Sequence, residues 1–227
     1  MQHGQLISLN IGMPTLMRYN QKDVLTGIFK LPAYRPLELL REGFEGDGQA
    51  DLEHHGGKDK AVCVYSYEHY PFWEQELGRR LPFGAFGENV TTKGIAEPDV
   101  CIGDIYQLGS AIVQVSQPRQ PCFKLAARYQ HPGLPLKVQE TGYTGFYFRV
   151  LQQGKVQVHD NLVLLRKHPQ ALSVAFANRI MHHDKNHHEA MERLLSVYEL
   201  SASWRSTFAK RLLGVRSDIS ARIEGRN

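Results

Sequence analysis

The feature that most constrains the fold is a series of short apolar segments, broken by Gly and Pro, along the first two-thirds of the chain. Most of these segments are rich in β-branched and aromatic residues, which is typical of strands. Gly109-Ser110 separates two of them by two residues, the signal for a tight hairpin. The predicted strands are Gly4 to Asn10, Gly27 to Lys30, Ala61 to Tyr65, Ile105 to Leu108, Ala111 to Ser116, Gly145 to Val150 and Leu162 to Arg166. The sequence therefore predicts a mainly β domain.

One helix is predicted among these strands. After Ser66, the apolar residues Tyr70, Trp73 and Leu77 recur at helical spacing. Pro71 is compatible with this helix because it falls in the first turn.

The pattern changes after Pro169, where three short amphipathic segments follow. Ser173, Asp184 and Ser201 are the predicted N-caps of three helices, since their side-chain oxygens can accept from free amides of the first turn. A bundle of about 45 residues is marginal alone, so we expect it to pack on the β domain. The predicted apolar faces are Phe176, Ile180 and Met181, then Ala190, Leu194 and Val197, then Trp204, Phe208 and Leu212.

The predicted domains are residues 1–168, which are mainly β, and residues 169–227, with the three helices at about 172–214. The tail from Arg216 to Asn227 is polar, and its segment from Ile223 to Arg226 matches a protease-cleavage sequence. We therefore give the tail no weight in the predicted fold.

The charge balance disfavours one class of function. The 227 residues carry 27 Lys and Arg against 23 Asp and Glu, a formal net charge of +4. No stripe of basic residues interleaved with aromatics accompanies this small excess, so nucleic-acid binding is the weakest interpretation. No segment approaches the roughly 20 apolar residues that span a bilayer, and the first residues lack the regions of a signal peptide. We expect a cytoplasmic protein without a membrane partner.

Three cysteines limit the metal and redox chemistry. Cys63, Cys101 and Cys122 are odd in number and far apart, which indicates a reducing compartment rather than a disulfide framework. Three thiols cannot supply the four ligands of an ordinary iron–sulfur cluster or a four-Cys zinc site. Cys63 and Cys101 lie in apolar runs, where a small buried side chain is expected.

Cys122 differs from the other two cysteines in its surroundings. It follows Gln117-Pro118-Arg119-Gln120-Pro121, a loop that its two prolines make stiff. Arg119 and Lys124 supply positive charge that favours a thiolate. The sequence therefore makes Cys122 a candidate reactive or metal-ligating thiol, with a plain loop cysteine as the alternative.

A second candidate is the segment from His54 to Lys60. Gly56 and Gly57 permit positive φ and can turn backbone amides outward, which with the flanking His and Lys makes an anion cradle plausible. The spacing matches neither the P-loop nor the dinucleotide fingerprint, so an ordinary basic turn is the alternative. In a third loop, Phe86 to Val90, Asn89 is placed either to bind a heterocycle or to close its own turn.

The histidine run at 182–188 resembles a metal site at first sight. His183 and His187 are four residues apart and could share an ion on one helical turn, but a third oriented ligand is lacking. Asp184 is needed as a helix cap, which places the histidines in a solvated first turn. We therefore predict no functional metal there.

Six motifs follow one another along the first 122 residues. They are Thr26-Gly27-Ile28-Phe29-Lys30, Gly46-Asp47, His55-Gly56-Gly57 with Asp59-Lys60-Ala61-Val62, Phe86-Gly87-Glu88-Asn89, Gly103-Asp104 and Gln117-Pro118-Arg119-Gln120-Pro121-Cys122. Together these motifs resemble the MOSC family, named after the C-terminal domain of molybdenum-cofactor sulfurases. The resemblance covers most of residues 1–168, and the segment at about 172–214 resembles the three-helix domain that follows MOSC in bacterial stand-alone YiiM-type members.

The resemblance implies a barrel-like β domain that binds molybdenum cofactor, with Cys122 as the protein ligand to the metal. One thiolate beside the dithiolene sulfurs of the pterin is a soft, charge-matched ligand. The residues that the resemblance makes cofactor-binding candidates are Lys30, His55, Gly56, Gly57, Lys60, Asn89 and Arg119. The aminotransferase-like domain of the sulfurases is missing, so pyridoxal phosphate is not expected.

Two functions follow from the resemblance. The first is a molybdoenzyme that reduces N-hydroxylated bases or related small molecules in detoxification, with Cys122 and His55 as catalytic residues. His55 is the candidate proton donor because its unperturbed pKa is near neutrality. The chain has no recognisable flavin or nicotinamide fingerprint, so a separate reductase, expected to be a flavoprotein, must return the electrons. The alternative is a carrier or sulfur-transfer module without substrate turnover.

Overall fold

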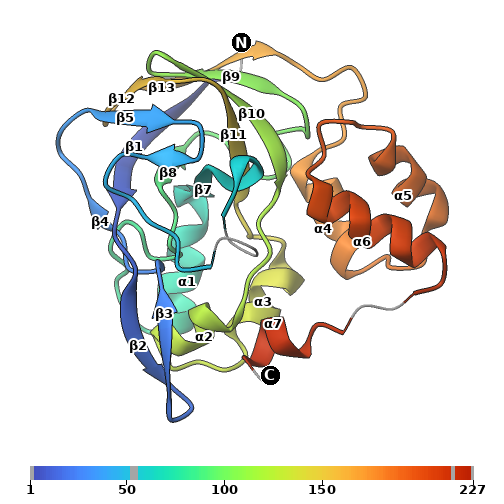
Figure 1. The fold of residues 1–227 in the computed structure, drawn as a ribbon, viewed down its shortest axis with the longest axis horizontal. Helices are drawn as coiled ribbons and strands as arrows, with labels where there is room; N and C mark the ends of the chain where they lie inside the picture. The colour runs from blue at the N-terminus through green and yellow to red at the C-terminus, as the bar shows by residue number, and fades with distance from the viewer. Residues whose placement is uncertain (1–2, 52–55, 216–217, 226–227) are drawn as a thin grey trace.

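The computed structural model describes residues 3–51, 56–215 and 218–225. Seven strands in this part of the chain form a closed barrel (Figure 1). They are β1 (His3–Ile11), β7 (Val62–Ser66), β8 (Val90–Lys93), β9 (Ile105–Leu108), β10 (Ala111–Pro118), β11 (Phe146–Gln152) and β13 (Asn161–Arg166). Their order is β13-β9-β10-β11-β7-β8-β1, and pairing of β1 with β13 closes the ring. The prediction of a barrel-like, mainly β fold with C-terminal helices is confirmed.

One pair of barrel strands, β7 and β8, is parallel, while the others are antiparallel. A parallel pair needs a long crossover connection. The predicted helix supplies it: α1 (Tyr70–Leu77) lies between the two strands in sequence, and Pro71 occupies its first turn. Tyr70 and Trp73 of α1 are buried, as the helical spacing predicts.

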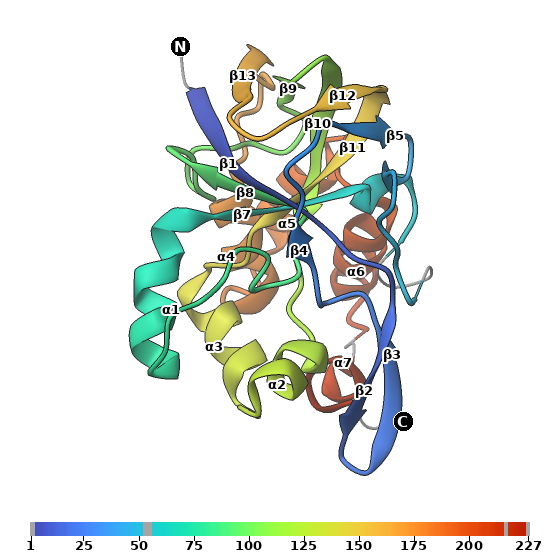
Figure 2. The ribbon, with the colours of Figure 1, turned by 90° about the vertical axis from the view of Figure 1, so that its left-hand side faces the viewer.

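Shorter strands extend the barrel. β4 (Leu31–Pro32) pairs with β1, and β5 (Leu37–Leu40), β6 (Gly43–Phe44) and β12 (Gly154–Val156) form a small second sheet. The hairpin of β2 (Thr15–Tyr19) and β3 (Lys22–Thr26) projects from the molecule (Figure 2).

The predicted strand from Gly27 to Lys30 is wrong. The ladder of β3 ends at Thr26, whose Oγ1 accepts from the amide of Ile28 at 3.2 Å. A Cβ added to Gly27 would lie 2.6 Å from the carbonyl oxygen of Gly48. The chain therefore passes against the loop around Gly48, and no neighbouring strand pairs with it.

Short helices cover one end of the barrel. α2 (Phe123–Tyr129) and α3 (Leu134–Thr141), which the sequence did not predict, lie with α1 at the end shown at the bottom of Figure 2. Two single-turn 3-10 helices, η1 (Lys58–Lys60) and η2 (Tyr67–His69), flank β7.

The C-terminal helices are α4 (Val174–His182), α5 (His188–Leu195) and α6 (Ala202–Leu212). Two of the three predicted caps are confirmed: Ser173 accepts from the amide of Phe176 at 3.0 Å, and Ser201 from that of Trp204 at 3.4 Å. The third is wrong, because α5 starts later than predicted.

At the start of α5, His187 Nδ1 accepts from the amide of Ala190 at 3.3 Å. Asp184 instead pairs with Arg179 of α4 at 2.6 Å, within the turn between the two helices. A carboxylate can cap only the amides that directly follow it, and these residues are not yet helical here.

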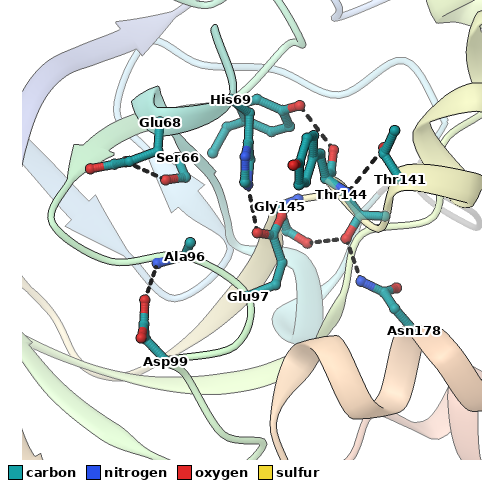
Figure 3. A network of polar contacts seen from close by, with 12 residues as sticks. Ser66, Glu68, His69, Ala96, Glu97, Asp99, Thr141, Thr144, Gly145 and Asn178 are labelled. Atoms are coloured by element: carbon teal, nitrogen blue, oxygen red, sulfur yellow. Dashed lines mark hydrogen bonds and ion pairs between the residues drawn. The ribbon is translucent and has the colours of Figure 1, made fainter. Parts of the chain in front are cut away.

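The three helices pack on the barrel, as their small size requires. Their apolar faces belong to the same buried cluster as the barrel core. A chain of polar contacts joins the two parts in Figure 3: Asn178 of α4 donates to Thr144 Oγ1 at 2.7 Å, and Gly145 donates to Glu97 at 2.7 Å. Glu97 also contacts the ring of His69 at 2.7 Å. Such buried contacts fix the orientation of the helices on the barrel.

The tail also contributes to the fold, contrary to expectation. α7 (Ser220–Glu224) packs beside α2, with Ile223 buried. A Cβ added to Gly225 would lie 2.8 Å from the ring of Phe123 in α2, so the two segments approach closely. In the described part of the chain no helix is both long and apolar enough to cross a membrane.

Candidate functional site

A cavity of about 610 Å³, including space open to solvent, lies at one end of the barrel. Side chains from loops far apart in the sequence line it. Five predicted site residues meet here: Lys30, Lys60, Asn89, Arg119 and Cys122. The other lining residues are Thr26, Gly27, Ile28, Asp47, Gly48, Gln49, Ala50, Cys63, Phe86, Gly87, Gln120, Lys124 and Tyr147.

Cys122 lies directly before α2 at the wall of this cavity. Its side chain is buried, with 6% exposed. β10 ends at Pro118, and the amide of Arg119 donates to Gly145 at 3.0 Å, so the loop that carries the cysteine is tied to the barrel. Arg119 and Arg222 both interact electrostatically with Cys122. Two guanidinium groups therefore lie near this sulfur.

Arg119 has a donor without an acceptor among the described residues. Its guanidinium is buried, and Nη2 donates to the carbonyl of Phe86 at 2.6 Å. Nη1 is also buried, yet no described residue accepts its hydrogen bond. An unpaired buried donor costs about 1–3 kcal/mol, and more when it is charged. The site therefore leaves this donor for an acceptor from outside the described residues.

Lys30 and Asn89 are held by the same carboxylate. Lys30 forms a buried ion pair with Asp47. The amide nitrogen of Asn89 donates to Asp47 Oδ2 at 2.8 Å, and its oxygen accepts from the backbone of Cys63 at 3.1 Å. Asp47 also accepts from the amide of Gly12 at 2.9 Å. Asn89 thus joins three segments of the wall, and its role toward a ligand stays a prediction.

In the motif Phe86-Gly87-Glu88-Asn89, Glu88 has a structural role that the sequence analysis did not predict. Glu88 is fully buried and accepts from the amides of Gly84 at 3.1 Å and Phe86 at 2.9 Å. It also accepts from the hydroxyl groups of Tyr70 and Thr91. Glu88 therefore fixes the loop whose Phe86 carbonyl positions Arg119.

Lys60 follows a turn that the barrel holds firmly. Its neighbour Asp59 accepts from Arg149 of β11 at 2.9 and 3.0 Å, and the amide of Lys60 donates to Gly57 at 2.9 Å. Burial lowers the pKa of Lys60, an effect that Asp51 and Asp59 oppose. A cation that is costly to bury favours an anionic ligand beside it.

The predicted glycine cradle is only partly described. Gly57 has the positive φ expected of it, 84°, and an added Cβ would meet open space. Neither Gly56 nor Gly57 lines the cavity. His54 and His55 lie outside the described residues, so the roles of these four residues stay predictions.

Two cavity residues were missed as site candidates, Cys63 and Tyr147. They are register partners on β7 and β11, with both side chains buried. Burial raises the pKa of Cys63 to about 11, although Arg119 opposes the rise, so this thiol stays neutral. Burial and the neighbouring Cys63 raise the pKa of Tyr147 as well. Strand alternation alone could have placed these residues on one face, but not at a cavity.

The prediction that the histidine run lies in a solvated first turn is only partly right: His183, His187 and His188 are exposed, but only His188 lies within the first turn of α5. His182 ends α4 and its ring nitrogen Nε2 is buried, His183 lies 3.2 Å from the carbonyl of Gln139, and His187 caps α5. Among the residues whose placement is described, no three His, Cys, Asp or Glu side chains are grouped to hold a metal ion. The absence of a functional metal here stays a prediction.

The residues present match the needs of a molybdenum cofactor. The cofactor phosphate requires cations and donors, which Arg119, Lys60 and Lys30 offer at one cavity. The unused Nη1 of Arg119 is the structural observation that indicates an oxyanion partner. Cys122 adds a soft sulfur ligand at the same wall.

Comparisons with known proteins show the family of the chain. A family model described as the MOSC domain matches residues 51–163, and one described as the YiiM-like, 3-alpha helix domain matches residues 172–214. The uncharacterized protein YflK of Bacillus subtilis is 56% identical over 206 residues, which cover 91% of this chain and 93% of YflK. The crystal structure of YiiM from Geobacillus stearothermophilus matches with a TM-score of 0.80 and 44% identity over 92% of this chain and 99% of that one.

A more distant relative carries a functional name. A protein named reductase from Gibberella moniliformis is 35% identical over 163 residues. The match covers 70% of this chain but only 29% of the fungal protein.

Proposed function

Because the chain belongs to the MOSC-domain family and carries the YiiM-like three-helix domain, we propose that it is a molybdenum-cofactor-dependent reductase of N-hydroxylated compounds. MOSC domains are associated with binding of molybdenum cofactor. The observation that carries the proposal is the joint placement of Cys122 and the unused Nη1 of Arg119 at one cavity. The relative named reductase supports an oxidoreductase over a passive carrier.

In this proposal the residues that line the cavity have distinct roles. Cys122 Sγ is the protein ligand to molybdenum, and Arg119, Lys60 and Lys30 neutralise the phosphate of the cofactor. Lys30 is already paired with Asp47, so Arg119 and Lys60 are the stronger phosphate partners. When bound, the cofactor supplies the two-electron chemistry.

The overall reaction is R–NHOH + 2 e⁻ + 2 H⁺ → R–NH₂ + H₂O. The N–O bond breaks, and the oxygen leaves as water. The electrons come from a separate reductase, expected to be a flavoprotein. The protein binds and orients the substrate and delivers protons, for which His55 is the proposed donor. Lys60 Nζ, whose pKa burial lowers, is a second candidate at the cavity wall.

Turnover by loaded protein tests this function. Protein loaded with molybdenum cofactor and supplied with reduced viologen should convert 6-hydroxylaminopurine to adenine, faster than free cofactor does. The Cys122→Ser variant should lose this conversion, and the matched Cys101→Ser variant, whose sulfur is buried away from the cavity, should keep it. Loaded wild-type protein without activity toward any N-hydroxylated compound would favour the carrier function instead.

A further inference from the structure

A second cavity opens beside the Cys122 site, between the barrel and the C-terminal helices. Its volume is about 1540 Å³, including space open to solvent. It shares Lys60, Gln120, Cys122, Lys124 and Tyr147 with the first cavity, so the two adjoin each other. Its outer wall comes from α3, α6, α7 and the turn between α4 and α5.

Cationic side chains dominate this cavity. Five Lys and Arg residues line it against two carboxylates among the described residues. Three of the cations, Lys185, Arg211 and Arg222, come from the C-terminal helices and their turns. A concave surface of this kind concentrates anions.

Both arginines are fixed in place and still have donors to spare. Arg211 Nη1 donates to the carbonyl of Met181 at 2.9 Å, and Arg222 Nη1 donates to that of Pro121. A guanidinium has five N–H donors, so the others remain for a ligand. Anchored arginines bind phosphate with two parallel hydrogen bonds, which a mobile lysine cannot do.

Two residues that line this cavity each have a buried polar atom without a partner in the described part of the chain: Gln139 Nε2 and His182 Nε2. Gln139 is only 6% exposed, so water reaches its amide poorly. Burial, together with Arg222 and Arg211, lowers the pKa of His182 to about 3, which leaves a neutral imidazole beside the cations. Phe123 and Tyr147 add aromatic surface. A side-chain amide can hydrogen-bond to a planar heterocycle, and aromatic rings can stack on it.

We propose that this second cavity binds a nucleoside monophosphate, with its phosphate at Lys185, Arg211 and Arg222 and its base directed toward Cys122. The proposal rests on the proposed function and makes an N-hydroxylated nucleotide the preferred substrate over the free base. The phosphate site lies in the three-helix domain and the tail, and none of its three cations lines the first cavity. It gives the C-terminal helices a role in substrate selection.

Binding to protein without cofactor tests the site independently of turnover. Isothermal titration calorimetry should show AMP binding at least tenfold more tightly than adenosine, and adenosine no more weakly than adenine. The Lys185→Gln/Arg222→Gln double variant should lose at least tenfold in AMP affinity while its adenosine affinity stays unchanged. Lys210→Gln, an exposed change on α6 outside the cavity, is the matched charge control and should bind AMP normally.

Because Arg222 also anchors the tail, a folding defect in the double variant would weaken AMP binding as well. The single variant Lys185→Gln controls for this effect. Lys185 is exposed, and its loss should weaken AMP binding about threefold without changing the melting temperature. Equal affinities of wild-type protein for AMP and adenosine would overturn the proposal. So would a double variant that binds AMP normally but retains less molybdenum and pterin, because the cations would then hold the cofactor phosphate. Phosphate-dependent AMP binding with no turnover by loaded protein would retain the nucleotide site and reject the proposed function.

Discussion

At the residue scale, burial does not separate the three cysteines, because each is at most 6% exposed. The surroundings of the three cysteines differ. Cys101 pairs with Ser173 away from the cavity, and Cys63 is kept neutral by burial. Cys122 alone of the three contacts both cavities. The sequence could identify Cys122, because prolines and charges flank it, but it could not show that Cys63 lies on the same wall.

Arg119 gives the first prediction. Replacing it with Lys keeps the charge but removes the planar fork that both contacts Phe86 and presents the unused Nη1. Arg119→Lys should therefore retain at least tenfold less molybdenum and pterin than wild type, measured on purified protein. Lys124→Gln, which removes a neighbouring charge, should have a smaller effect. Full cofactor content in Arg119→Lys would show that Nη1 does not face the phosphate.

His182 gives a prediction of pH dependence. Its pKa is about 3 in the folded protein against 6.5 for the free group, chiefly because of burial. Between pH 6.5 and pH 3 this histidine is therefore protonated in the unfolded chain but neutral in the folded protein. The free energy of unfolding falls as the pH drops through this range.

The size of this effect can be measured. Between pH 7 and pH 5 the histidine should cost about 2 kcal/mol in the free energy of unfolding, followed by urea denaturation. His182→Gln should remove that loss, whereas His188→Gln, at the start of α5, should retain it. A wild-type protein and a His182→Gln variant with parallel pH profiles would contradict the buried, neutral imidazole.

At the scale of elements, the sequence predicted those strands correctly whose buried face determines the pattern of apolar residues. The strands that became β1, β7, β9, β10, β11 and β13 were recognisable, because closing the barrel buries their apolar residues. The β2–β3 hairpin was missed, since its turn places Asn20 and Gln21 at φ of 47° and 63°, and Gln is unusual there. The seven-residue helix α2 is too short for a periodic signal.

Helix caps give the third prediction. Ser173→Ala removes an acceptor that the first turn of α4 uses, and should cost about 1 kcal/mol in the free energy of unfolding. Asp184→Ala removes only a largely exposed ion pair with Arg179, and should cost less than about 0.5 kcal/mol. Urea denaturation of both variants checks this difference. Losses of equal size would mean that Asp184 acts as the cap after all.

At the scale of the whole molecule, barrel closure creates the site. Lys30, Lys60 and Asn89 lie on three separate segments, and Arg119 and Cys122 share a fourth, and their motifs were visible in the sequence. Their meeting point was not, because it depends on which strands become neighbours in the ring. The second cavity could not be predicted either, since it exists only where the helices dock on the barrel. Long-range packing, which no local pattern encodes, decides both.

The central claim is that Cys122 is the protein ligand to molybdenum. X-ray absorption at the molybdenum edge measures it most directly, on wild-type, Cys122→Ser and Cys101→Ser protein loaded with the cofactor. We expect Cys122→Ser to show one sulfur ligand fewer than wild type, and Cys101→Ser to match wild type, since Cys101 lies outside the cavity. The same number of sulfur ligands in Cys122→Ser and wild type would contradict the assignment.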